Sequence, residues 1–374
     1  MSNESTNALS LQTPLSGRAV DAIVAHHDPL RARWRPRDGF LLATIEHAWE
    51  RSGREDWRLL IRETVNGLVD ESGRVASYRR EDYDLGMIAP GVVLFRLLAD
   101  TGDDRYAHAL STLRGQLRGQ PRTRSGGFWH SRSCPDQMWV SDAYRVAPFY
   151  ARCASFFGDP DAYHDVAHQI LLFEDRARDP LTGLLSHAWD ESRRQLWANP
   201  ETGRSQCCWG RALGWWMMAV VDSLDHLPHS HPDRARILSA LERLARAIMR
   251  YQDHGSGLWF QVIDQGKREG NFLESSSACM FAYSLGKAER LGYLHGAEFR
   301  ETARRAFEGV RRRFLEISAD GAAILHSVSA SVPLGGHPYR DGSFSCYTRE
   351  GPVSDELYGL GALALASMEM ELAP

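Results

Sequence analysis

Helical periodicity recurs along nearly the whole chain and constrains its fold more than any other feature. Apolar residues fall at three- and four-residue spacing, which is the pattern of an amphipathic helix. Alternating strand patterns are weak and short, as at Leu258–Ile263. The sequence therefore predicts an all-α protein. The expected helices are Phe40–Glu50, Trp57–Leu68, Gly91–Asp100, Tyr106–Leu117, Met138–Phe157, Ala162–Phe173, Gly210–Leu227, Asp233–Tyr251, Leu273–Leu291, Ala297–Leu315 and Glu356–Met370.

The order of helices and loops predicts a closed ring of helical hairpins. Short turns such as Thr101–Asp104 and Gly158–Pro160 join the two helices of a pair, and longer loops separate the pairs. No linker rich in Pro, Ser and Gly divides the chain. We expect an N-terminal extension with the first helix at residues 1–38 and a single barrel domain at residues 39–374. The long loops are Arg118–Asp136, Asp179–Trp209, Asp253–Phe272 and Ser327–Pro352.

Composition and charge exclude several classes of protein. The 374 residues carry a net charge of −4, so the chain lacks the basic surface of a nucleic-acid-binding protein. No apolar run is long enough to span a bilayer, and the polar start, Met1–Pro14, lacks the apolar segment of a signal peptide. Six scattered cysteines without CxxC spacing indicate reduced thiols. We therefore expect a cytoplasmic monomer or homodimer with no nucleic-acid or membrane partner.

The long loops hold tryptophans and histidines that follow no helical period. They occur in Gly126–His130, in Ser186–Asp190 and in Cys208–Arg211, which runs into Gly214–Trp216. Exposed loops normally avoid tryptophan, and tryptophan faces are good platforms for sugar rings. The eleven tryptophans of the chain therefore predict an aromatic cleft at the loop end of the ring, suited to a sugar.

Short motifs from about Gly39 to Met370 match one known family. They are Pro121-Arg122-Thr123, Gly126–His130, Asp136–Trp139, Pro148-Phe149, Gly183-Leu184, His187–Glu191, Trp197–Pro200, Thr202-Gly203, Trp209–Arg211, Gly214-Trp215, Ser256–Trp259, Asn271–Ser276 and Tyr339–Ser343. Together they resemble the unsaturated rhamnogalacturonyl hydrolases of glycoside hydrolase family 105, which are relatives of the unsaturated glucuronyl hydrolases.

This resemblance implies a fold, a substrate and a reaction. The fold is an (α/α)6 barrel, in agreement with the helical pattern. The substrates are small acidic disaccharides left by polysaccharide lyases, with a C4=C5 double bond in the terminal uronic acid. An acid protonates C4, water adds at C5, and the hemiketal opens and releases the aglycone. The reaction needs a carboxyl that gives and takes a proton, and no metal or cofactor.

The chain departs from the family at both acidic positions. The resemblance puts the proton donor two residues after Trp139, where this chain has Ser141, and the second acid at Gly86. The nearest carboxyls are Asp142 and Asp84. Either these carboxyls have moved along the chain, or the usual hydration is lost. Two further differences lie nearby, because Ser131 stands where lysine is common and Arg145 where methionine is usual.

We predict Asp142 and Asp84 as the catalytic pair. Asp142 is expected in a partly dry site, where burial and a facing Asp84 would raise the pKa of its carboxyl. All but one of the expected substrate-binding residues lie in the matched motifs, and the exception, Trp216, directly follows Trp215. One of these two tryptophans is expected in the core. Glu274 is expected to build its loop and not to do chemistry. The substrate-binding set is His130, His187, Trp189, Arg211, Trp215 and Trp216.

Three alternatives remain open. The first is an ordinary inverting glycosidase with Asp84 and Asp142 as its acid and base. The second is a sugar epimerase, which would need paired histidines across the cleft, and only His130 and His187 are candidates. The third is a sugar-binding protein without catalysis, which the substitutions at both acidic positions would suit.

Overall fold

The computed structural model describes residues 13–372, and these are mainly helical, which confirms the predicted all-α class. The α-helices are α2 (Leu15–Ala25), α3 (Pro36–Ser52), α4 (Glu55–Asn66), α5 (Leu94–Thr101), α6 (Asp104–Gly119), α7 (Asp142–Phe157), α8 (Pro160–Ala177), α9 (Gly210–Leu224), α10 (Arg234–Arg250), α11 (Ser275–Arg290), α12 (Ala297–Arg313), α13 (Phe344–Thr348) and α14 (Leu357–Leu372). Short 3-10 helices are η1 (Arg80–Asp82), η2 (Leu85–Met87), η3 (Ala89–Val93) and η4 (Ile263–Gln265).

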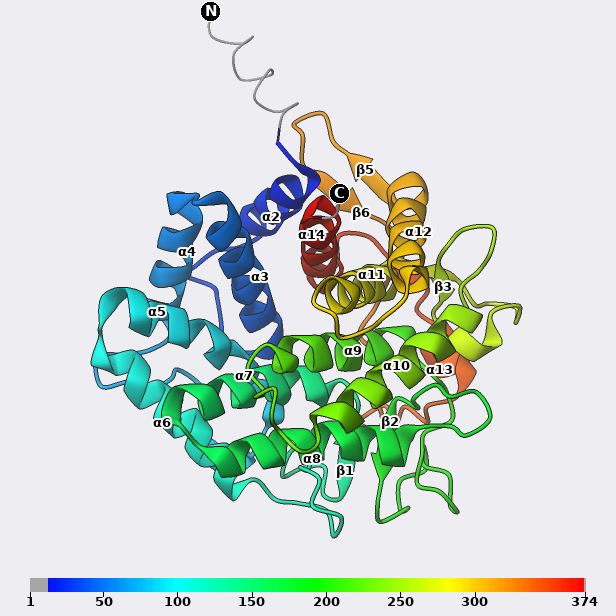
Figure 1. Cartoon of the computed structure of the whole chain (residues 1–374), viewed down its shortest axis with the longest axis horizontal. Coiled ribbons are helices and arrows are strands. Elements are labelled where there is room, and N and C mark those ends of the chain that lie inside the picture. The colour runs from blue at the N-terminus through cyan, green and yellow to red at the C-terminus, as the bar shows by residue number, and fades with distance from the viewer. Residues whose placement is uncertain (1–12, 373–374) are drawn as a thin grey trace, which may run out of the picture.

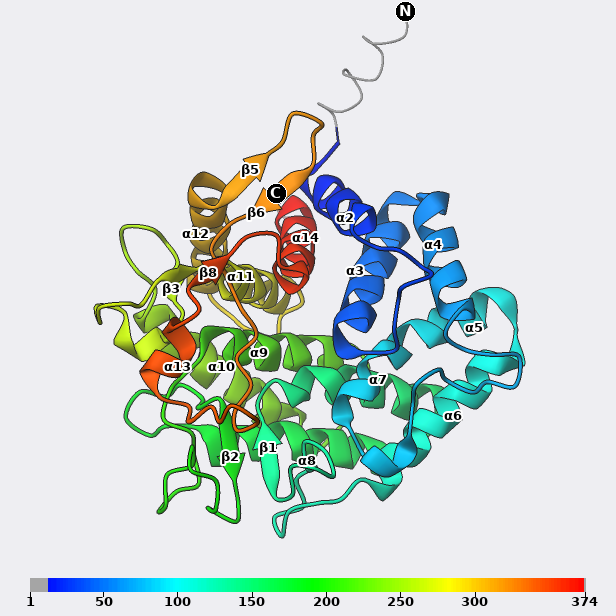
Figure 2. The same ribbon diagram turned by 180° about the vertical axis from the view of Figure 1, so that it is seen from behind.

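The helices form two concentric layers (Figures 1 and 2). In the inner layer α3 packs on η3, η3 on α7, α7 on α9, α9 on α11, α11 on α14, and α14 again on α3, so the inner layer closes on itself. In the outer layer each helix packs on the helix that precedes it: α4 on α3, α8 on α7, α10 on α9, and α12 on α11. The helix α6 packs on α5, which continues η3, and α2 packs on α14.

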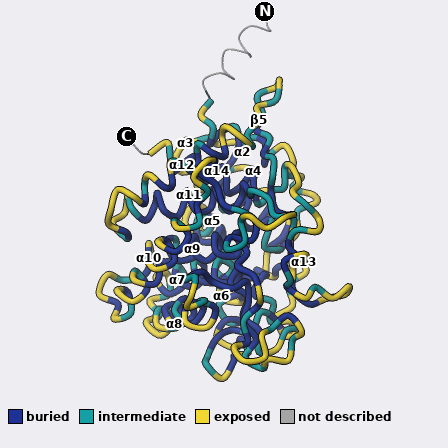
Figure 3. Tube along the Cα trace, turned by 90° about the vertical axis from the view of Figure 1, so that its right-hand side faces the viewer, coloured by how far each residue is buried: buried dark blue, intermediate teal, exposed yellow. Residues whose placement is uncertain are grey.

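Sequence pattern assigns each helix to its layer. All residues of α9 except Asp222 are buried, which is expected of a helix that is covered on every side. The outer helix α4 instead buries a single stripe, Trp57, Ile61, Thr64 and Val65, whose spacing brings these side chains onto one face. Buried residues concentrate accordingly in the inner layer, as Figure 3 shows.

Strands are short and serve to join loops. The antiparallel pairs are β1 (Gln137–Trp139) with β2 (Ala188–Asp190), β3 (Trp259–Phe260) with β4 (Leu273–Glu274), β5 (Leu315–Ile317) with β6 (Ala323–Leu325), and β7 (Val328–Ser329) with β8 (Pro352–Val353). The pair β1–β2 ties the segment before α7 to the long loop before α9. The pair β7–β8 spans the last long loop.

The expected helix Met138–Phe157 begins four residues too early. The sequence pattern starts it at Met138, but α7 begins at Asp142 and Gln137–Trp139 forms β1. Met138 pairs with Trp189 of β2, so a contact with a distant segment overrides the local helical pattern. Between residues 13 and 372 no helix is both long and apolar enough to cross a bilayer.

Candidate active site

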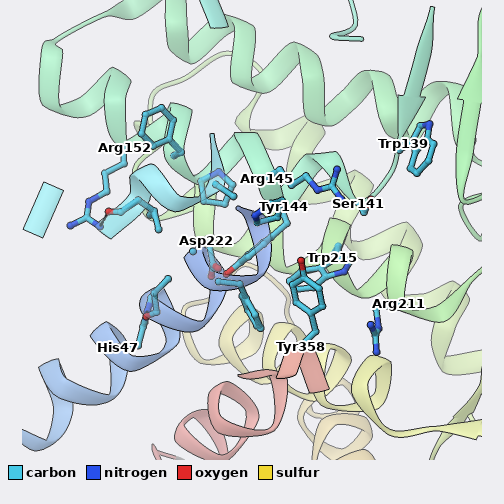
Figure 4. Close-up of a pocket in the computed structure, with 18 of the residues that line it drawn as sticks. His47, Trp139, Ser141, Tyr144, Arg145, Arg152, Arg211, Trp215, Asp222 and Tyr358 are labelled. Carbon is cyan, nitrogen blue, oxygen red and sulfur yellow. Dashed lines mark hydrogen bonds between the residues drawn. The ribbon is translucent and has the colours of Figure 1, made fainter. Parts of the chain in front are cut away.

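A cavity of about 560 Å³ runs inside the ring of inner helices, and we call it the central cavity. Three of the four long loops contribute to its lining. The first contributes His130, the second contributes His187 and Trp209, and the last contributes Val332. The remaining long loop supports them, because Gln261 accepts a hydrogen bond from Trp209 Nε1 at 3.1 Å. The walls come from α3, α7, α9 and the start of α14 (Figure 4).

His130 and Asp142 form the best-defined polar contact at the loop end of the cavity. Nδ1 of His130 lies 2.8 Å and 3.1 Å from the two carboxylate oxygens of Asp142. The imidazole stacks on the indole of Trp139, with ring centroids 4.2 Å apart and planes 7° from parallel. His130 lines the cavity and its side chain is 15% exposed. The ring is therefore fixed on one side and accessible on the other.

Asp142 itself lies behind this histidine. It is the first residue of α7, its side chain is 1% exposed, and it does not line the central cavity. Its second partner is Arg145, whose Nη1 lies 2.9 Å from Oδ1. Burial alone would raise the pKa of this carboxyl, but the charges of His130 and Arg145 outweigh it and hold the pKa below its ordinary value. The expectation of a raised pKa for Asp142 is therefore wrong.

Asp84 does line the cavity, at the edge nearest His130. The amide of Leu85 donates to the carbonyl of His130 at 3.2 Å, which holds the two segments together. The carboxylate of Asp84 accepts a hydrogen bond from the amide of Gly86 at 2.7 Å. A Cβ atom at Gly86 would lie 2.7 Å from Cγ of Pro36, so an aspartate at this position would require Pro36 to move.

His187 shares the loop end of the cavity with His130, as predicted. Both rings contact Trp139, and the centroid of His187 lies 5.7 Å from that indole. His187 Nδ1 lies 2.9 Å from the hydroxyl of Tyr347. Burial lowers the pKa of His187 to about 3, so the ring is neutral near pH 7. The charge of Asp142 opposes this shift, and the charges of Arg145 and His130 reinforce it.

Two arginines, Arg145 and Arg211, line the loop end of the cavity, and they differ in how far their charge is already paired. Arg211, at the start of α9, is 2% exposed, lies 3.2 Å from the carboxylate of Glu356 and donates from Nε to Ser276 at 3.0 Å. Arg145 is 26% exposed and binds Asp142 through Nη1. Within residues 13–372 no hydrogen bond engages its Nε or Nη2. Arg145 was singled out from the sequence only as a departure from the family.

The middle of the cavity is aromatic. Trp215 meets Phe40, Tyr144 and Tyr358 with ring centroids 4.9, 5.0 and 5.4 Å away (Figure 4). Trp215 therefore takes the predicted position, and Trp216 is fully buried in the core and does not line the cavity. The aromatic neighbours of Trp215 were missed, because helical spacing alone does not separate a cavity wall from a packed core.

Trp189 lies outside the central cavity, contrary to prediction. Its indole Nε1 donates to the carbonyl of Thr202 at 3.0 Å, and the guanidinium of Arg176 lies 5.4 Å from its ring centroid. Trp139, on the partner strand β1, lines the cavity instead. Both belong to the same two-stranded pair, and sequence could not tell which of them faces inward.

The opposite end of the cavity is lined by ionisable side chains. Lys287 of α11 lies 2.7 Å from Asp222 and 2.7 Å from Asp225. Glu46 of α3 lies 3.4 Å from Arg152 of α7. All five residues line the central cavity. Glu46 and Arg152 lie about 11 residues further along α3 and α7 than the loop end, or roughly 16 Å at 1.5 Å per residue. No group of three His, Cys, Asp or Glu residues in the described chain is arranged to hold a metal ion.

Comparison with known proteins identifies the family. The sequence profile of Glycosyl Hydrolase Family 88 matches residues 16–373. The chain belongs to this family. A family 105 glycoside hydrolase of C. acetobutylicum has 37% identity and a TM-score of 0.92, over 96% of this chain and 99% of the other. Protein Atu3128 of Agrobacterium fabrum is 37% identical over 227 residues, which are 59% of this chain and 96% of that protein.

Another protein similar to this chain carries a functional name. The unsaturated rhamnogalacturonyl hydrolase YesR of Bacillus subtilis is 25% identical over 278 residues, 73% of this chain and 76% of YesR. The resemblance read from the motifs is thereby confirmed, and the chain, a member of family 88, is a glycosidase.

Proposed function

We propose that this glycosidase acts on small disaccharides whose terminal uronic acid carries a C4=C5 double bond, and that it does so by hydrating this bond. The relationship to YesR, named an unsaturated rhamnogalacturonyl hydrolase, supports the substrate class. On this proposal the ring of helical hairpins is an (α/α)6 barrel, and the enzyme is cytoplasmic. The boundary between the N-terminal extension and the barrel domain at residue 39 stays a prediction. α2, from the predicted extension, packs on α14.

The observation that carries this proposal is the available charge of Arg145. A uronate needs a cation in its pocket, and a guanidinium with two free nitrogen positions offers a carboxylate a paired contact. Arg145 lines the cavity beside Tyr358 and the His130–Asp142 pair, whereas the charge of Arg211 is already balanced by Glu356 (Figure 4). Trp215 and Trp139 add aromatic surface to the lining of the same cavity.

The substrate-binding set that we propose follows from the lining of the cavity. It comprises His130, His187, Arg211 and Trp215 from the predicted set, with Arg145, Trp139 and Tyr358 in addition. Asp84 is the carboxylate that reaches the cavity at the loop end, so it stays in the proposed site. The cavity volume falls in the range of roughly 300–1,000 Å³ that is common for small-ligand sites.

The test compares two disaccharides with the same linkage, one with an unsaturated and one with a saturated uronic acid. We expect loss of the absorbance of the conjugated double bond and release of the aglycone with the first, and no turnover of the second. In heavy water the product should carry deuterium at C4. Cleavage of the saturated disaccharide would instead indicate an ordinary glycosidase, and binding without turnover of either would indicate a sugar-binding protein.

A further inference from the structure

We infer that His130 donates the proton in this enzyme, and that Asp142 positions it, in place of the carboxyl that the family resemblance puts at Ser141. This inference rests on the proposed function and names the group that carries out its first step. Ser141 lines the cavity, but a serine hydroxyl is far too weak an acid to protonate a double bond. The donor must therefore be another group at the same end of the cavity.

The geometry of the imidazole fits a proton donor. Nδ1 is engaged by both carboxylate oxygens of Asp142, at 2.8 and 3.1 Å, which leaves Nε2 as the nitrogen available to the cavity. No hydrogen bond engages Nε2 among residues 13–372. Stacking on Trp139 fixes the plane of the ring. A histidine oriented by a buried carboxylate is a common arrangement for general acid and base catalysis, because the carboxylate stabilises the imidazolium.

The other candidates for the donor are less suitable. Asp142 does not reach the cavity, and both of its oxygens are occupied by His130, with Arg145 also bound to one of them. His187 has a hydroxyl partner, Tyr347, in place of a carboxylate, and its pKa of about 3 leaves it neutral. Asp84 reaches the cavity, but its carboxylate is already engaged as the acceptor of a hydrogen bond from the amide of Gly86.

The reaction balances with this donor and water alone. The proton leaves Nε2 of the imidazolium and bonds to C4 through the electron pair of the C4=C5 bond. Positive charge develops at C5 and is shared by the ring oxygen. Water bonds to C5 and gives a proton to Nε2, which restores the imidazolium. The hemiketal then opens at its bond between C5 and the ring oxygen, and the hemiacetal formed at C1 releases the aglycone.

The test uses the full-length protein and an unsaturated galacturonyl-rhamnose disaccharide from a lyase digest. The variants are His130→Asn and Asp142→Asn, with His47→Asn as the matched control. His47 lines the far end of the same cavity, and its Nδ1 bonds the carbonyl of Ala43. We expect His130→Asn to lower kcat by about 10²–10⁴-fold, the usual contribution of a general acid, and His47→Asn to change it less than about threefold. Tryptophan fluorescence on adding substrate and thermal melting show whether each variant folds and binds.

The pH profile separates positioning from a structural role of Asp142. Around His130 the charged or titratable groups are Asp142 and Arg145 of α7, His187 of the neighbouring loop, and Asp84. A general acid must be protonated to act, so in the unmutated enzyme kcat/KM should fall toward alkaline pH. Asp142→Asn removes the carboxylate that stabilises the imidazolium, so this fall should move to lower pH. A structural role of Asp142 would lower the rate without moving the profile.

The two proposals fail in different ways. If the unmutated enzyme does not turn over the disaccharide, the proposed function is wrong whatever the variants do. If it does, and folded His130→Asn that still binds substrate keeps its rate within about threefold, His130 is not the donor although the function stands. A rate lost in Asp84→Asn but kept in His130→Asn would assign the donor to Asp84. If His130→Asn does not fold, an Asp142→Asn profile that coincides with the unmutated profile overturns the inference.

Discussion

Arg145 is the residue that we propose to distinguish an acidic sugar from a neutral one by its charge. It is held at one nitrogen by Asp142 and retains two others for a ligand. Its place on α7, one turn after the first residue of the helix, sets it beside both His130 and Tyr358 at the loop end of the cavity. A methionine there would leave Arg211 as the arginine at the loop end of the cavity, and Glu356 already neutralises its charge.

We predict that Arg145→Met raises KM for the unsaturated disaccharide by about 10–100-fold. The reason is the loss of a charge-assisted hydrogen bond, worth roughly 1.5–3 kcal/mol, where about 1.4 kcal/mol corresponds to a tenfold change. Steady-state kinetics on the free acid and on its methyl ester measure this effect. The ester lacks the charge, so the variant and the unmutated enzyme should have similar KM values for it. An equal rise for both substrates would show that Arg145 acts through Asp142 and not on the carboxylate.

The elements are held in place by buried side chains at their ends, and α11 shows this most clearly. Its N-cap, Glu274, is fully buried, and its carboxylate accepts hydrogen bonds from the amides of Ser276 and Ser277 and from the amide of Ser329 in β7. One carboxylate thus satisfies the start of an inner helix and joins it to the last long loop. The expectation that Glu274 builds its loop is confirmed.

Glu274→Ala should therefore destabilise the protein by about 2–5 kcal/mol, because a cap is lost and three buried amides lose their partner. Urea unfolding followed by circular dichroism measures this loss. Glu71→Ala, at an exposed turn, is the matched control and should change the stability by less than about 0.5 kcal/mol. If the two variants unfold at the same urea concentration, the buried carboxylate of Glu274 does not hold α11 in place.

Much of the element order could be predicted from sequence, whereas the direction of individual side chains could not. Helical spacing was sufficient to predict where most outer and inner helices lie in the chain. Glycines and prolines were sufficient to predict the long loops between them. The strand pair β1–β2 gave no such signal. Residues that lie opposite each other share a face of the pair, so Trp189 lies with Met138, and Trp139 faces the other way, into the cavity.

Only those residues of the site that lie in recognisable motifs could be predicted from sequence. His130, His187, Arg211 and Trp215 line the cavity as expected. The pairing of His130 with Asp142 could not be predicted, because 12 residues, a turn and a strand separate them and no periodicity relates their side chains. Adjacent residues of a helix differ by about 100° in direction, which is why Asp142 faces away from the cavity that Ser141 lines.

At the scale of the whole molecule, the central cavity links two chemically distinct ends. The loop end holds the His130–Asp142 pair, and the far end holds Glu46, whose Oε2 is buried without a hydrogen-bond partner in the described residues. Burial raises the pKa of Glu46 to about 8, although the charge of Arg152 opposes it. The protein thus keeps a carboxyl protonated inside the ring at a pH where exposed carboxyls are ionised.

This raised pKa makes the stability of the ring depend on pH. A group whose pKa is about 8 in the folded chain and 4.5 in the unfolded chain stabilises the fold fully below pH 4.5 and loses that contribution as pH rises through 8.

The variant Glu46→Gln cannot ionise at this position and keeps the size of the side chain. We predict that the Tm of this variant, relative to the unmutated protein, rises by about 2 °C or more between pH 5 and pH 8.5, since roughly 1 kcal/mol shifts Tm by a few degrees. Calorimetry over this range measures the difference. Glu71→Gln, exposed in the turn after α4, should give a difference that stays constant with pH. A constant difference for Glu46→Gln as well would mean that the buried carboxylate is ionised and that Arg152 stabilises it as an ion pair.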